Sequence, residues 1–190
     1  SSSIPASTTI KNVIVDEVTV QSTGGIAGGF IGYSSASDII IMNSTFAGFV
    51  AGLDSAGGFI GHSSGNSVII QNSASSGGII GVEGGSGAAG GFIGTIVSGN
   101  AIIHKSFMST LAVVSAGDVG VFVGNDEMNL VSLIDSYYDS DKVQFATSTT
   151  NPVGEKPEYD PEKTGEALKT GAFDKYKDLY VPGSLGNFTK

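Results

Sequence analysis

Few side chains of this 190-residue chain are of the types that perform catalysis or bind transition metals. Cysteine is absent, so neither a disulfide nor a thiolate zinc site can form. The two histidines, His62 and His104, stand at positions where the repeats described below carry other residue types, and we expect them on different faces of the molecule. We therefore predict that the chain is not an enzyme and requires no cofactor.

The acidic side chains suggest two kinds of chemistry. Carbohydrate-active β-helix enzymes use Asp, Lys or Arg clustered on one face, but this chain has no arginine, and the acids within its repeats are scattered at Asp38, Asp54, Glu83 and Asp118. Hard oxygen ligands at short spacing can bind calcium. The candidate ligands are Asp135, Asp139 and Asp141, with Asp126 and Glu127 nearby. The glycine that usually turns a calcium loop is missing, which favours solvated turn acids over a metal site.

Two further motifs could carry a modification or a ligand. Asn43-Ser44-Thr45 and Asn187-Phe188-Thr189 are sequons for N-glycosylation, and we expect Asn187 to be the modified one if Asn43 lies in a packed corner. The glycine-rich run at 84–89 could suggest a phosphate-binding loop. Since no Lys or helix follows it as a P-loop requires, we interpret this run as a surface loop.

A repeat determines where all of these residues lie. The pentapeptide Gly-Gly-Phe-Ile-Gly occurs at 28–32, 57–61 and 90–94, and a variant, Gly-Val-Phe-Val-Gly, occurs at 120–124. Each copy is followed at the same distance by a block such as Ile41-Met42-Asn43-Ser44. A period of about 30 residues, with length variation confined to one segment, is typical of a solenoid in which each repeat forms one coil.

The repeat predicts the fold class. At about 3.3 Å per residue, three short strands and their corners account for one coil. Helix is disfavoured because glycine costs about 1 kcal/mol in a helix interior, and the repeats are rich in glycine. We predict an all-β protein, a parallel β-helix with three faces per coil and a short C-terminal loop and helix cap.

Stacked coils place equivalent side chains in columns. The predicted columns are Phe30, Phe59, Phe92 and Phe122; Ile31, Ile60, Ile93 and Val123; and Ser44, Ser73, Ser106 and Ser136. Neighbouring residues of a strand face opposite ways, so Phe and Ile can both lie in the core only if a corner separates them. We expect the phenylalanines inside, with an outward aromatic stripe as the alternative. The Asn-Ser pairs are expected to stack at a corner and to satisfy the turn backbone by hydrogen bonds.

The expected organisation has three parts. Residues 1–9 are interpreted as a linker or chain start, 10–141 as the solenoid, and 142–190 as a C-terminal cap and tail. Because the chain begins without Met, we expect a mature or excised segment. A net charge of −9 disfavours nucleic acid as a partner, and the lack of an apolar stretch of about 20 residues disfavours insertion into a membrane.

The alternation of Gly-Gly-Phe-Ile-Gly, a polar turn and Ile-x-Asn-Ser resembles the GLUG repeat. That repeat is found in bacterial surface proteins, in the N-terminal regions of immunoglobulin-A-cleaving zinc peptidases and in large extracellular proteins of some protists. The segments 135–139 and 163–173 are similar to the stretch that follows the last repeat in such proteins, although those tails often carry Trp where this chain has Tyr138. The resemblance covers about residues 10–175 and implies an extracellular β-solenoid; the His-Glu-x-x-His motif of the peptidases is absent.

The expected function is that of a structural or adhesive module at the cell surface or in an extracellular matrix, a rod that spaces domains or presents a binding face. Its expected partners are other copies of itself, other surface or matrix proteins, or glycans. One alternative is a fibre subunit whose open coil ends, at residues 10–20, join by β-augmentation. The other is a carbohydrate-binding or carbohydrate-active β-helix.

Overall fold

The computed structural model describes residues 7–82, 87–126, 130–138 and 144–146. These residues form a parallel β-solenoid of about four coils, without a helix among them. Each strand pairs in parallel with its equivalent in the next coil, as in Ile39 with Val68 and Ile41 with Ile70. The predicted all-β solenoid and its repeat of near 30 residues are therefore confirmed.

Each complete coil contains four strands, and the stacked strands form four sheets. Sheet A consists of β1 (Thr8–Lys11), β5 (Asp38–Met42), β9 (Ser67–Gln71), β13 (Asn100–His104) and β17 (Val131–Ile134). Sheet B consists of β2 (Ile14–Gln21), β6 (Thr45–Gly52), β10 (Ala74–Val82), β14 (Phe107–Val114) and β18 (Tyr137–Tyr138), with β19 (Gln144–Ala146) also paired to β14. Sheet C consists of β3 (Ile26–Gly28), β7 (Ser55–Gly57), β11 (Ala88–Gly90) and β15 (Val119–Gly120). Sheet D consists of β4 (Ile31–Ser34), β8 (Ile60–Ser63), β12 (Ile93–Ile96) and β16 (Val123–Asp126).

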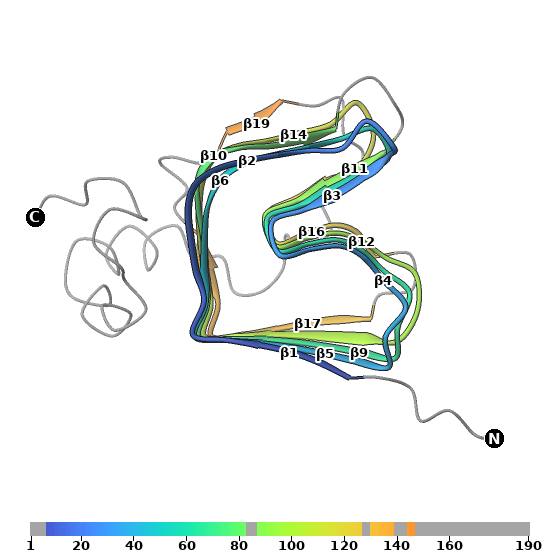
Figure 1. The fold of residues 1–190 in the computed structure, drawn as a ribbon, viewed down its shortest axis with the longest axis vertical. Helices are drawn as coiled ribbons and strands as arrows, with labels where there is room; N and C mark the ends of the chain where they lie inside the picture. The colour runs from blue at the N-terminus through green and yellow to red at the C-terminus, as the bar shows by residue number, and fades with distance from the viewer. Residues whose placement is uncertain (1–6, 83–86, 127–129, 139–143, 147–190) are drawn as a thin grey trace, which may run out of the picture.

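The prediction of three faces per coil is wrong, because the Gly-Gly-Phe segment reverses the chain. Figure 1 shows sheets C and D folded back into the middle of the coil, with the turn between β3 and β4 pointing toward sheet B. The reversal brings backbone against backbone. A Cβ at Gly28 would collide with the carbonyl oxygen of Ile31 and would lie 2.5 Å from the amide nitrogen of Gly61. Only glycine permits this approach.

The strands of sheet B are long and irregular. Asp16 and Glu17 of β2 oppose the single residue Ala47 of β6, which is a β-bulge, and Glu17 has a φ of 54°. A second register shift lies between Ser76 and Ile80 of β10. Bulges bend a strand locally, which fits the course of sheet B around two sides of the coil in Figure 1.

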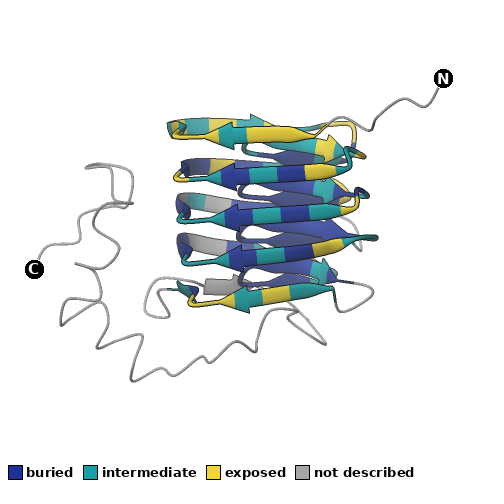
Figure 2. Ribbon diagram, turned by 90° about the horizontal axis from the view of Figure 1, so that it is seen from below, coloured by how far each residue is buried: buried dark blue, intermediate teal, exposed yellow. Residues whose placement is uncertain are grey.

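The core runs as one cluster along the whole stack. Along the strands of sheet A, buried residues alternate with less buried ones, and the outermost coils are the most exposed (Figure 2). The predicted linker lies mostly outside the described residues, since β1 begins at Thr8. Of the predicted cap at 142–190, only 144–146 fall within them, as β19, and the loop at 84–89 is described only from Gly87.

Candidate functional site

A column of four buried serines lies at the corner between sheets A and B. Each hydroxyl donates to the carbonyl two residues earlier, as Ser73 Oγ does to Gln71 O at 2.8 Å. Each also accepts an N–H from the preceding coil: Ser44 N to Ser73 Oγ is 3.2 Å, and Ser73 N to Ser106 Oγ is 3.3 Å. Ser106 N bonds to Ser136 Oγ in the same way at 3.2 Å. The serine column is therefore a continuous hydrogen-bond ladder.

A second column precedes the serines and turns the corner. Its members all have left-handed backbone, with φ between 47° and 58°: Asn12, Asn43, Asn72, Lys105 and Asp135. Asn adopts this region at low cost. Asn43 Nδ2 donates to Asn12 Oδ1 at 3.2 Å, and Asn43 Oδ1 accepts from Asn72 Nδ2 at 3.3 Å.

The first sequon, Asn43-Ser44-Thr45, lies at this corner. The side-chain amide of Asn43 is engaged on both sides by its column neighbours, and Thr45, which supplies the sequon hydroxyl, is buried. Asn43 is itself exposed, and its Nδ2 carries a second N–H that these two hydrogen bonds do not use, so the asparagine column does not by itself block modification. The other predicted acceptor, Asn187, lies outside the described residues.

The phenylalanine column lies inside the stack. Rings of Phe30 and Phe59 are 4.8 Å apart between centroids, those of Phe59 and Phe92 are 4.7 Å apart, both edge-on, and those of Phe92 and Phe122 are stacked at 5.7 Å. The adjacent column, Ile60, Ile93 and Val123 with the partly buried Ile31, belongs to the same core. Both columns are internal because the chain reverses at the phenylalanine, one residue before β4 or its equivalent begins.

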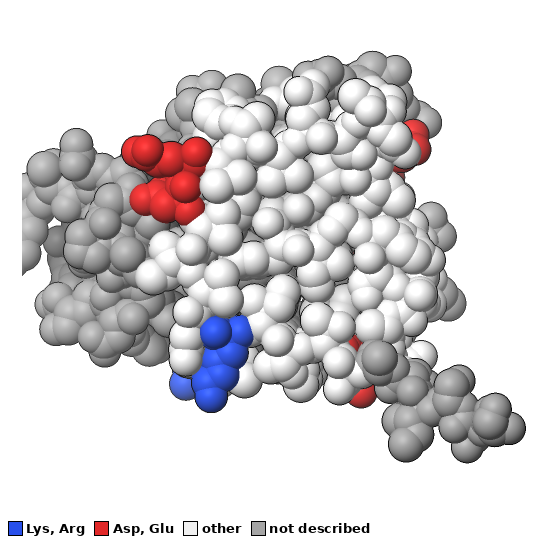
Figure 3. Space-filling model, viewed as in Figure 1, with Lys and Arg blue, Asp and Glu red and all other residues white. Residues whose placement is uncertain are grey.

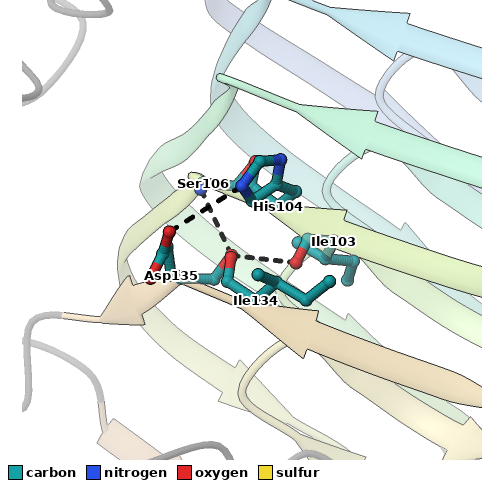
Figure 4. Close-up of polar contacts among 6 residues, drawn as sticks. Ile103, His104, Ser106, Ile134 and Asp135 are labelled. Carbon is teal, nitrogen blue, oxygen red and sulfur yellow. Dashed lines mark hydrogen bonds and ion pairs between the residues drawn. The ribbon is translucent and has the colours of Figure 1, made fainter.

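The two histidines lie in different sheets. His62 is in β8 of sheet D, where its ring stacks on Tyr33 with centroids 5.4 Å apart. His104 is in β13 of sheet A, and its Nε2 lies 3.8 Å from Asp135 Oδ2 beside the serine ladder (Figure 4). The structure does not bring the two imidazoles together.

Only some of the acids proposed as calcium ligands lie within the described residues. Asp135 stands at the corner near His104, whereas Asp139 and Asp141, like Glu127, lie outside the described residues. Asp126 accepts the N–H groups of Leu130 and Val131 at 2.8 and 3.0 Å, so its carboxylate shapes a turn. Among the residues that the structure describes, no group of three His, Asp or Glu side chains is placed to hold a metal ion.

The outward faces contain two features that sequence reasoning missed. In sheet A the middle residue of each apolar triplet faces out, so Ile40, Ile69 and Ile102 form a partly buried aliphatic column. The alternation of strand residues applied to Ile39-Ile40-Ile41 would have found it. On sheet D, Tyr33 is 57% exposed, and its hydroxyl is 2.9 Å from Ser64 Oγ. Figure 3, which looks down the stack as Figure 1 does, shows an end of the solenoid, where the charged groups lie at the margins and the centre is uncharged.

The geometry defines a class of protein, an all-β parallel β-solenoid of about four coils. Comparison with protein-family models, with curated proteins and with solved structures finds no match. Within the described ranges, no helix is long and apolar enough to cross a membrane.

Proposed function

We propose that this chain is a structural or adhesive module of the GLUG-repeat type, working at the cell surface or in an extracellular matrix by presenting fixed side chains to a partner. The supporting observation is that the four sheets are parallel and that sheets A, C and D keep their register from coil to coil, which holds outward side chains in straight columns. Four coils at a strand spacing of about 4.8 Å extend only roughly 20 Å. Presentation of a face is therefore better supported than the spacing of distant domains.

A glycan is the partner that one specific observation favours. The exposed ring of Tyr33 is held in place by stacking on His62 and by the contact of its hydroxyl with Ser64. A fixed aromatic ring with one apolar face and a polar tip is suited to stack on the apolar face of a sugar. On the turns after sheet D, Ser98 Oγ donates its hydrogen to Ser64 O at 2.8 Å, which leaves the Oγ of Ser98 able to accept a hydrogen bond from a sugar hydroxyl.

A binding screen tests this proposal. The purified chain is applied to immobilised glycans and extracellular matrix proteins, and each bound glycan is analysed for cleavage. Tyr33→Ala should lose binding, while Leu53→Ala, which alters another exposed apolar side chain, should keep it. Absence of binding to every surface by the intact chain would contradict the presentation role, and cleavage of a bound glycan would contradict the prediction that the chain is not an enzyme.

A further inference from the structure

The first coil leaves the apolar columns partly uncovered. Its core residues, Ile10, Val15, Val20, Phe30 and Ile31, are only partly buried. Their neighbours in the second coil are each at most 1% exposed: Ile41, Phe46, Val50, Phe59 and Ile60. A solenoid end that faces water normally carries polar residues. The apolar columns of this end instead continue unchanged to its surface.

The backbone at this end is also open. Strands β1, β2, β3 and β4 each stand first in their sheet, so one edge of every strand has no partner strand among the described residues. A row of unpaired N–H and C=O groups is a template for pairing with another chain. Charged residues in these strands are confined to Lys11, Asp16 and Glu17. The end therefore combines open edges, apolar side chains and a rim that carries both signs of charge.

The corner residue of this coil argues against a further coil stacked in the same direction. In the coils that follow, the corner serine accepts the N–H of the coil before it, as Ser73 accepts that of Ser44. The first coil has Val13 at this place, which donates its N–H to Ser44 Oγ at 3.2 Å but has no hydroxyl to accept one. A parallel coil placed in front would leave its corner N–H unpaired, at a cost of about 1–3 kcal/mol.

The size of the end fits a stable dimer. A close-packed coil of about 30 residues with strands about 4.8 Å apart has a cross-section of roughly 800 Å². Each partner in a standard protein interface buries about 800 Å². By contrast, the outer face of sheet A, about five residues by five strands, offers roughly 400 Å², which is half of that area.

We propose that the first coil, formed by β1 to β4, docks onto the first coil of a second copy of this chain related by a two-fold axis. The two edges then run antiparallel, so the missing hydroxyl at Val13 costs no ladder bond, and the contact closes after two copies. The opposite end is less suited to receive this coil, since the described residues there add β17, β18 and β19 to sheets A and B but nothing beyond β15 and β16 in sheets C and D. The dimer goes beyond the presenting role proposed above; because Tyr33 belongs to β4 of the docking coil, docking places the two candidate glycan contacts near the interface.

Sedimentation velocity over a range of concentrations tests the dimer. The intact chain should pass from 19.2 kDa to twice that mass and no further. Ile10→Lys and Val20→Lys place a charge on the docking surface and should each weaken association roughly tenfold or more, since burial of an unpaired charge exceeds 1.4 kcal/mol. The matched control is Ile134→Lys in β17, at a position 46% exposed in the last coil, and it should dimerise normally. Circular dichroism checks that all three variants retain strand content.

Each other result would overturn the proposal. A chain that stays monomeric at every concentration has no such surface, and masses that keep growing indicate a head-to-tail fibre. Dimers that survive Ile10→Lys and Val20→Lys, or that are lost in Ile134→Lys, place the contact elsewhere. The binding screen with the monomeric Ile10→Lys variant is scored separately, so failure of the dimer and failure of the presenting role remain distinguishable.

Discussion

The individual residues that decide whether this chain stacks are the small polar ones at its corner. Ser73 illustrates the point, because its Oγ both donates to Gln71 O and accepts the N–H of Ser44. Replacement by alanine leaves that buried N–H without a partner. We predict that Ser73→Ala lowers the free energy of unfolding by about 1–3 kcal/mol, measured by urea denaturation. The control Ser35→Ala, at an exposed position in the loop between β4 and β5, should change it by less than about 0.5 kcal/mol; equal losses in both variants would contradict the ladder.

Where a buried hydroxyl lacks a hydrogen-bond partner among the described residues, its removal is expected to raise the stability of the fold. Thr110 is fully buried in β14, and its Oγ1 has no hydrogen-bond partner among the residues that the structure describes, as is also true of the Oγ atoms of Ser63 and Ser75. An unpaired buried hydroxyl costs about 1–3 kcal/mol. We predict that Thr110→Val, which keeps the branched shape, raises the thermal midpoint and adds on the order of 1 kcal/mol of stability. A clear loss of stability would show that the hydroxyl has a partner in solution.

At the scale of elements, the sequence predicted the coil but not its cross-section. The constant spacing from the pentapeptide to Ser44, Ser73 and their equivalents indicated stacked strands. A single sequence is enough to detect this spacing. The count of four strands depends on a reversal inside Gly28-Gly29-Phe30 that places two sheets back to back. Glycine is compatible with a turn, a bulge or a close approach alike, so the sequence alone did not distinguish them.

The variant fourth repeat, Gly-Val-Phe-Val-Gly at 120–124, supports a close approach of neighbouring coils at these glycines. A Cβ at Gly29, Gly58 or Gly91 would meet the carbonyl of the equivalent residue in the next coil. Val121 holds that position in the last copy, and no equivalent residue follows it among the described residues. The Val121 side chain, which replaces a glycine of the repeat, is therefore accommodated at a position where no equivalent residue of a following coil lies against it among the described residues.

A glycine substitution tests the reversal. A Cβ at Gly57 would collide with the carbonyl of Ile60 and lie 2.6 Å from the nitrogen of Gly94, both of which are backbone. We predict that Gly57→Ala costs more than about 3 kcal/mol or prevents folding, because backbone atoms cannot move aside without disrupting neighbouring coils. At Gly24 the nearest atom would be Ser22 Oγ at 3.9 Å, so Gly24→Ala should be tolerated. Similar behaviour of the two variants in thermal unfolding would contradict the close approach.

At the scale of the whole molecule, the repetition that made the fold predictable gives no indication of which residues carry the function. The candidate site residues taken from the sequence, such as Ser106 and Phe92, are the most repetitive ones, and the structure places them inside the stack or at its corner. The outward candidates, Tyr33 and the Ile40 column, occupy positions where the repeats differ or where burial is only partial. Repetition identifies what the coils need for stacking, whereas recognition depends on side chains that the stack leaves free to vary.

If the molecule is a stack of nearly equivalent units, an added coil should join it. Ser44 and Ser73 are 29 residues apart, so a second copy of residues 45–73 inserted after Ser73 supplies one complete coil in register. Stability of repeat proteins is approximately a sum of unit and interface terms, and the denaturant slope follows the surface exposed on unfolding. We predict that this insertion raises both the free energy of unfolding and the slope, by roughly a quarter for one coil added to about four. An insertion of the same residues in scrambled order should be cut by proteases and should raise neither quantity; an unscrambled insertion that behaves like the scrambled one would show that the coils are not interchangeable.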